Sequence, residues 1–170
     1  MNDFLTPAQR SALMAKVKGH SNASTELKLV AVFRALGVTG WRRGAVIRAA
    51  AGPKSKGPTS KVGQRPFLVR PDFVFPKRKL AVFVDGCFWH GCPIHATQPK
   101  QNAEFWREKI ARNQARDLLV TRTLRARGWR VIRLWEHELT KRYEARLLAR
   151  LRRVGLIARP LMVQVLGDSI

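Results

Sequence analysis

The segment from Val84 to His95 (VDGCFWHGCPIH) gathers many side chains that can do chemistry. It holds both cysteines of the chain, two of its four histidines and an aspartate that ends an apolar run. Cys87, Cys92 and His95 are ligands of the type that zinc prefers. His137, which follows a later apolar run, would complete a closed four-ligand structural site. The alternative of two buried thiols and two surface histidines stays open, because the spacing matches zinc patterns only loosely.

A second reactive group is a pair of aspartates on two expected strands. Residues 67–75 and 80–84 are apolar and β-prone, and the short segment between them suits a tight hairpin. With such a turn, Asp72 lies beside Val84 and Asp85. Carboxylate and carbonyl oxygens bind Mg²⁺, which polarises a phosphodiester and lowers the pKa of its water. A single aspartate is more often a turn or surface residue, so the interpretation depends on the pair.

Proton transfer needs a further residue. Asp72, a hairpin and then Asp85 resemble the core of the PD-(D/E)xK nucleases, but position 87 is cysteine where that core has lysine. The ordinary pKa of a histidine side chain would suit His90 to proton transfer at neutral pH. Asp117, on the inward stripe of a long expected helix, would orient this histidine.

Three aromatic residues adjoin the reactive segment. Phe88 and Trp89 lie in its glycine-flanked loop, and Trp106 lies at the start of the long helix. Apolar wedges insert between base pairs at a cost of roughly a few kcal/mol per step, and a mismatched step lowers this cost. A mispaired or damaged site would therefore be favoured. Packing in the core is the competing interpretation, above all for Trp106.

The charge of the chain indicates a polyanionic partner. Lys and Arg number 33 against 11 Asp and Glu, a formal net charge of +22, so nucleic acid is the first partner to test. Residues 52–63 are rich in Gly, Pro, Ser and Lys and predict a mobile basic loop within a flexible insertion at about residues 42–70. The sequence shows no membrane span and no signal peptide, so we expect a cytoplasmic, nucleoid-associated protein.

The elements that must position these residues fit one α/β domain over residues 1–170. In chain order we expect helices over residues 6–18 and 24–36, strands over 67–75 and 80–84, a helix over 102–127, a strand over 129–135 and a basic helix over 140–153. Thr6 and Gln9 form the capping box of the first helix. Thr140 caps the last one.

These residues occur in an order that resembles the very-short-patch repair (Vsr) endonucleases. The resembling residues are Arg70–Phe75, Ala81–Pro93, Phe105–Trp106, Lys109, Asn113, Arg116–Asp117, Gly128–Val131 and Trp135–Glu138, with Arg10, Ser11 and Glu26 nearer the start. The GCFWHGCP block is the most specific part. The resemblance covers nearly the whole chain apart from the basic insertion and the last residues.

The resemblance implies a restriction-endonuclease-like single domain, with a central mixed β-sheet flanked by helices and a structural zinc site. It implies an enzyme that nicks double-stranded DNA 5′ of the thymine in a T:G mismatch, which arises when 5-methylcytosine deaminates. A cytosine-5 DNA methyltransferase and MutL-type mismatch-repair proteins would be its functional partners. We expect it to act as a monomer.

The resemblance also implies a role for each site residue. Asp72 would be the central Mg²⁺ ligand, joined by the carbonyl of Val84. Glu26 and Asp85 would arrange metal-bound waters, and His90 paired with Asp117 would handle protons. The structural zinc ion would be held by Cys87, Cys92, His95 and His137. The wedge that intercalates next to the mismatch would be Phe88, Trp89 and Trp106. Some members carry histidine at position 85 and cysteine at position 137, so these two roles vary within the family.

Two other functions stay open. A nuclease of this architecture could act in restriction or phage defence without mismatch preference, and a comparison of matched and T:G duplexes separates the two. A non-enzymatic, zinc-stabilised DNA-binding module would need no inward aspartates, and it would show salt-sensitive binding without Mg²⁺-dependent nicking. The basic insertion is longer than this family leads us to expect. The sequence therefore does not determine which bases next to the cleavage site the protein recognises.

Overall fold

A central four-stranded sheet positions many of the reactive residues, which lie at the ends of its strands or on the segments next to them. The computed structural model describes residues 6, 9, 25–49, 67–97 and 99–158. The helices and strands are α2 (Glu26–Ala35), β1 (Arg42–Arg43), β2 (Ile47–Ala49), β3 (Phe67–Val69), β4 (Phe73–Phe75), β5 (Leu80–Asp85), α3 (Ala103–Arg125), β6 (Arg130–Trp135) and α4 (Glu144–Arg153). Short 3₁₀ turns span Pro76–Arg78 (η1), Glu136–Leu139 (η2) and Lys141–Tyr143 (η3).

The sheet is mixed, as expected. Its order is β1-β4-β5-β6, with β1 and β5 antiparallel to β4 and with β6 parallel to β5. Parallel neighbours need a long crossover, and α3 supplies it. Because β5 and β6 run in the same direction, Asp85 pairs in register with Trp135 at their carboxyl ends. Residues that follow these two strands therefore meet at one edge of the sheet.

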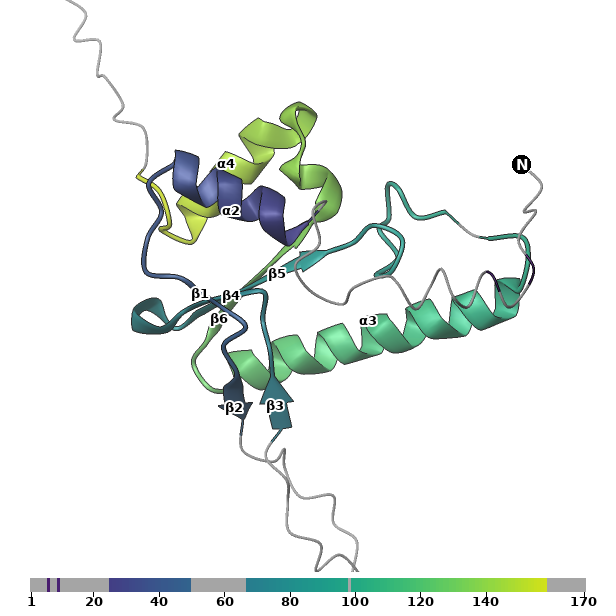
Figure 1. The fold of residues 1–170 in the computed structure, drawn as a ribbon. Coiled ribbons are helices and arrows are strands. Elements are labelled where there is room, and N and C mark those ends of the chain that lie inside the picture. Colours follow the sequence, from purple (N-terminus) through teal and green to yellow (C-terminus); the bar gives the residue numbers. More distant parts are fainter. Residues whose placement is uncertain (1–5, 7–8, 10–24, 50–66, 98, 159–170) are drawn as a thin grey trace, which may run out of the picture.

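Helices cover both faces of the sheet. Figure 1 shows α2 and α4 on one face and the long α3 on the other. Strand alternation points Phe73, Phe75 and Val82 toward α2 and α4, whereas Val74 and Ala81 pack toward α3. Both sides of β5 are thus buried, which explains its nearly continuous apolar sequence.

The aromatic core fixes α2 against the sheet. The ring of Phe33 meets the rings of Phe73 and Phe75 edge to face, with centroids 5.2 and 5.7 Å apart. Each such pair contributes roughly 0.5–1.5 kcal/mol beyond its area burial. This packing places Glu26, at the start of α2, near the reactive edge of the sheet.

The strand expected over residues 67–75 is broken into two. Its first part, β3, pairs with β2 in a separate two-stranded sheet, and its second part, β4, joins the central sheet. Pro71 lies at the break, and proline has no N–H to donate to a strand ladder. The break frees the Asp72 side chain to bond to β5.

The other expected elements agree with the structure to within a few residues, with one exception. The last helix begins at Glu144, not at Thr140, because η2 and η3 intervene.

Thr6 and Gln9 form the reciprocal bonds of a capping box, at 2.9 and 3.2 Å. The rest of the first expected helix lies outside the described residues. The prediction of a flexible insertion at about residues 42–70 is wrong at both ends, where β1 pairs with β4 in the central sheet and β2 pairs with β3. Residues 50–66, which include the expected basic loop, lie outside the described residues.

The helix α3 is the longest described element, at 23 residues. It carries charged side chains along much of its length. None of the helices in the described ranges combines the length and apolar character needed to cross a membrane.

Candidate active site and metal-ligand cluster

Asp72 bonds directly to β5. The backbone N–H of Val84 donates to Oδ2 of Asp72 at 2.7 Å, which confirms the expected placement of Asp72 beside Val84. Burial raises the pKa of Asp72 to about 6; the Val84 hydrogen bond opposes this shift, and the charges of Glu26 and Asp85 add to it. Three carboxylates therefore share one region, an arrangement that attracts a cation.

Two of these carboxylates already have a cationic partner. Oε2 of Glu26, which is buried, lies 2.8 Å from Nη2 of Arg43. Both oxygens of the buried Asp85 accept hydrogen bonds from Arg133, at 2.7 Å from Nε and 2.6 Å from Nη2. Asp72 differs from these two carboxylates. It accepts a hydrogen bond from a backbone N–H, and it forms no ion pair within the described residues.

His90 and Asp117 form a close pair. Nδ1 of His90 lies 2.6 Å from Oδ2 of Asp117, so the loop histidine and the helix aspartate are in contact, as expected. Burial by itself lowers the pKa of His90, but the hydrogen bond that His90 donates to Asp117 and the negative charges of Asp85 and Asp117 outweigh it, and the net shift is upward. With its Nδ1 proton held by Asp117, the ring keeps Nε2 for exchange with a reacting group.

The loop after β5 is fastened to α3 by two amides. Nδ2 of Asn113 donates to the carbonyl of Trp89 at 2.8 Å, and Nε2 of Gln114 donates to the carbonyl of His90 at 3.3 Å. Gly91 has a φ of +63°, and a Cβ atom there would lie 2.5 Å from Nε2 of Gln114. The positive φ favours glycine, and an added Cβ would displace the Gln114 amide that binds the loop.

The three aromatic residues form one cluster. The ring centroid of Phe88 lies 5.1 Å from that of Trp89 and 5.1 Å from that of Trp106, and the two tryptophans are 5.8 Å apart. All three are half-buried. The structure therefore unites loop and helix aromatics beside His90 and leaves part of each ring exposed.

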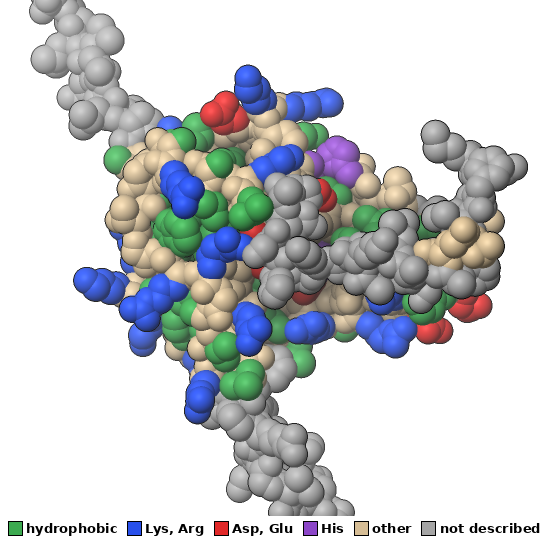
Figure 2. Space-filling view, viewed as in Figure 1, with side chains coloured by type: hydrophobic (Ala, Val, Ile, Leu, Met, Phe, Trp, Pro, Cys, Tyr) green, Lys and Arg blue, Asp and Glu red, His purple; other side chains and the backbone are tan. Residues whose placement is uncertain are grey.

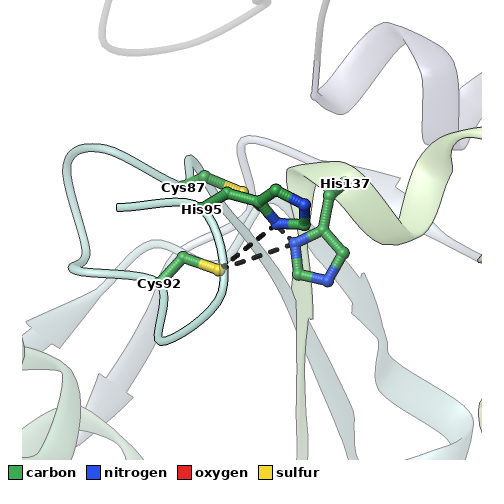
Figure 3. Close-up of side chains that lie close together, drawn as sticks. All are labelled: Cys87, Cys92, His95 and His137. Atoms are coloured by element: carbon green, nitrogen blue, oxygen red, sulfur yellow. Dashed lines mark hydrogen bonds between the residues drawn. The ribbon is translucent and has the colours of Figure 1, made fainter. Parts of the chain in front are cut away.

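The two cysteines and two histidines also converge, as Figure 3 shows. Each offers one ligand atom, and these four atoms lie within 4.8 Å of one another. Nδ1 of His137 lies 3.3 Å from Sγ of Cys87 and 3.6 Å from Sγ of Cys92, and Nδ1 of His95 lies 3.9 Å from Sγ of Cys92. His137 reaches the loop because it follows β6, whose end adjoins the end of β5.

Without a bound cation, the thiol of Cys87 stays protonated and the imidazole of His137 stays neutral. Burial raises the pKa of the Cys87 thiol to about 11, and the nearby Cys92 adds to this rise. Burial and His95 lower the pKa of His137, which keeps its imidazole neutral. A neutral imidazole is the form that binds a metal, and a bound cation deprotonates the thiols.

The sequence interpretation missed the role of Arg133. This residue lies in β6 between the buried Ile132 and Leu134, so strand alternation directs it to the opposite face, toward α3. Asp85 occupies the same face of β5. A charged residue between two apolar neighbours in the middle of a strand was the available signal, because buried charges are seldom left without a partner. The amides Asn113 and Gln114 gave no comparable signal beyond their helical spacing.

Known proteins match this chain along most of its length. The family described as "DNA mismatch endonuclease Vsr" matches residues 54–96. The type II nicking enzyme V.NaeI of Lentzea aerocolonigenes is 56% identical over 70 residues, which are 41% of this chain and 42% of that protein. V.NmeDIP of Neisseria meningitidis serogroup C is 36% identical over 141 residues, 82% of this chain and 81% of that protein. DNA mismatch endonuclease Vsr of Escherichia coli K12 is 40% identical over 74 residues, 43% of this chain and 47% of that protein.

The mixed sheet and the strand-end acidic cluster, together with these similarities, define the class: an endonuclease with a restriction-endonuclease-like α/β domain. The similarity to the Neisseria protein extends over four fifths of both chains. The chain therefore belongs to the Vsr family of DNA mismatch endonucleases.

Proposed function

We propose that this protein is a Mg²⁺-dependent endonuclease that nicks duplex DNA 5′ of the thymine in a T:G mismatch. The observation that carries the proposal is the His90–Asp117 pair at 2.6 Å, in the same charged cluster as Asp72 and next to half-buried aromatic rings. A proton-handling group, a cation site and a stacking surface are the three parts that mismatch-directed hydrolysis needs.

Asp72 and the carbonyl of Val84 would hold the divalent cation, and Glu26 and Asp85 would order water around it. The raised pKa of Asp72 supports this assignment, because burial, together with the nearby charges of Glu26 and Asp85, makes the ionised carboxylate costly until a cation neutralises it. When bound, the cation neutralises phosphate charge and acidifies water. His90 accepts the proton of the attacking water through Nε2, while Asp117 holds its other nitrogen. The water oxygen bonds to phosphorus, and the bond from phosphorus to the 3′ oxygen breaks. The 3′ oxygen takes up a proton from solvent, and the nick carries a 5′-phosphate.

Cys87, Cys92, His95 and His137 would hold a structural zinc ion. In a tetrahedral site with Zn–S near 2.3 Å and Zn–N near 2.05 Å, sulfur and nitrogen ligands lie about 3.6 Å apart. The Sγ to Nδ1 distances of 3.3, 3.6 and 3.9 Å bracket this value. The ion would tie the loop that carries His90 to the end of β6.

Phe88, Trp89 and Trp106 would form the wedge that enters the base stack. Their shared cluster and partial exposure support this role, and α3 holds the carbonyl of Trp89 in place. Figure 2 shows Lys and Arg side chains over much of the visible face of the described chain, which suits contact with phosphates. A T:G substrate would make a cytosine-5 DNA methyltransferase and MutL-type proteins its functional partners.

The test is nicking of a labelled duplex panel with Mg²⁺ present. The panel holds T:G, other mismatches and matched pairs in several sequence contexts. We expect a nick 5′ of the mismatched thymine, and we expect Asp72→Ala and His90→Ala each to abolish it. Full cleavage by both variants contradicts the mechanism.

A second function rests on the names of the relatives. V.NaeI and V.NmeDIP are named type II nicking enzymes, with no mention of a mismatch. The alternative is therefore nicking in restriction or phage defence without mismatch preference. Equal nicking of T:G and matched duplexes in the same panel favours this alternative.

A further inference from the structure

A guanidinium lies between the two carboxylates nearest His90. Nη2 of Arg133 contacts Oδ1 of Asp85 at 2.6 Å and Oδ1 of Asp117 at 2.8 Å. His90 binds the other oxygen of Asp117, Oδ2. Asp117 therefore links the histidine to the arginine, with one oxygen for each.

Arg133 determines which hydrogen bonds and which cations Asp85 and Asp117 can accept. Nδ1 of His90 lies 3.8 Å from Oδ1 of Asp85, too far for a hydrogen bond, and both oxygens of Asp85 are taken by the guanidinium fork. Asp85, His90 and Asp117 offer ligand atoms within 4.8 Å of one another. A second divalent cation among them would be repelled by a guanidinium that stays charged at any working pH.

Neighbouring groups hold Arg133 in place. Its strand position pairs with Phe83 on β5, and its Cζ lies 4.8 Å from the centroid of the Phe83 ring. Its backbone carbonyl accepts a hydrogen bond from Arg150 on α4. Nη1 is buried without a hydrogen-bond partner in the described chain, a cost that the two carboxylates offset. An arginine fixed in this way can orient what it binds.

We propose that Arg133 is a positioning residue: by holding Asp85 and Asp117, it makes Asp117 accept the Nδ1 proton of His90 and leaves Nε2 for proton transfer. The catalytic consequence rests on the proposed function, because it needs His90 as the proton-handling group. The tautomer itself does not depend on that function. The competing role is neutralisation of the buried Asp85 charge and nothing more.

The experiment combines Arg133→Met, Arg133→Lys and the double variant Arg133→Met/Asp85→Asn in the zinc-loaded protein. The double variant removes the buried charge that Arg133→Met leaves unpaired, so it protects the fold. Long-range ¹H–¹⁵N spectra, at a pH where His90 is neutral, report which ring nitrogen carries the proton. Steady-state nicking of a T:G duplex gives kcat and KM.

Positioning predicts one Nδ1–H tautomer in the parent protein and a mixture in Arg133→Met. It predicts a fall in kcat of about 10- to 100-fold with little change in KM, and a smaller loss in Arg133→Lys. In the double variant it predicts the same tautomer mixture as in Arg133→Met. An unchanged tautomer in Arg133→Met, or a single Nδ1–H tautomer in the double variant, overturns the proposal. If the parent protein does not nick, the proposed function fails, and the tautomer alone decides the role of Arg133.

Discussion

Nδ1 of His90 lies 2.6 Å from Oδ2 of Asp117, although 27 positions separate these residues in the chain. The contact exists because β5 delivers the loop that carries His90, and α3 returns along the face of the sheet toward which Asp85 also points. A base held by a carboxylate is an arrangement that hydrolases use repeatedly.

Asp117→Asn should lower kcat by about 100- to 10,000-fold while KM changes little, because an amide no longer fixes the histidine tautomer. Single-turnover nicking of a T:G duplex measures the loss. His90→Gln should cost at least as much, and the double variant should be no worse than His90→Gln alone. Additive losses would show that the two residues act independently.

Binding of Mg²⁺ should weaken in acid because of Asp72. Burial raises the pKa of Asp72 to about 6, so a proton competes with the cation below that pH and not above it. The Kd should rise roughly tenfold per pH unit below pH 6 and be level above about pH 7. Calorimetric titration of the zinc-loaded protein measures this dependence. Asp72→Asn should bind weakly at every pH, and a parent Kd that is independent of pH contradicts the assignment of Asp72.

Local patterns in the sequence were enough to place much of the site. The β4–β5 hairpin follows from a short turn between two apolar runs, and it brings Asp72 to Val84. The convergence of His137 on the cysteines follows from the parallel pairing of β5 with β6. The break at Pro71 was predictable in the same way, because proline cannot donate to a ladder, but the apolar run around it concealed this signal.

The partner of Asp85 depends on tertiary packing. A strand-end carboxylate suits either a metal or a guanidinium, and residue spacing does not distinguish these partners. The choice is made by β6, which carries Arg133 to the same face of the sheet, and by α3, which brings Asp117 against it. The start of α4 was likewise displaced by η2, where the fully buried Glu138 accepts from the backbone N–H of Trp135.

Removal of zinc should destabilise the fold. Metal analysis should find one zinc ion per chain, and Cys92→Ser, at a residue 1% exposed, should lose it. A loss of about 3 kcal/mol would lower the Tm by about 6–12 °C in a domain of this size. Calorimetry with and without a chelator measures the shift, and Cys92→Ser should no longer respond to the chelator. An unchanged Tm in both cases contradicts a structural metal.

Gly91→Ala should impair nicking far more than Gly37→Ala. Both glycines have a φ of +63°, so the backbone strain is shared, at roughly 1–2 kcal/mol. A Cβ at Gly91 would meet Gln114 at 2.5 Å and Ile110 at 3.0 Å, whereas a Cβ at Gly37 meets nothing within 4 Å. We expect Gly91→Ala to shift the loop off α3 and lower kcat by more than about tenfold, since small displacements of reacting groups are costly. Equal kcat values in two folded variants would show that the fit against α3 does not matter.

Trp89→Ala should weaken nicking by an amount set by base stacking. A stacking contact is worth roughly 1–3 kcal/mol, or about 5- to 150-fold in kcat/KM. Phe105→Ala is the matched control, because Phe105 is 51% exposed and touches Trp106 but lies outside the loop. A duplex with an unpaired bulge beside the mismatched thymine has already lost base stacking at that step. If the Trp89 ring enters the base stack, the defect of Trp89→Ala should therefore be smaller on the bulged duplex. A defect of equal size on both duplexes would assign Trp89 to packing within the aromatic cluster instead.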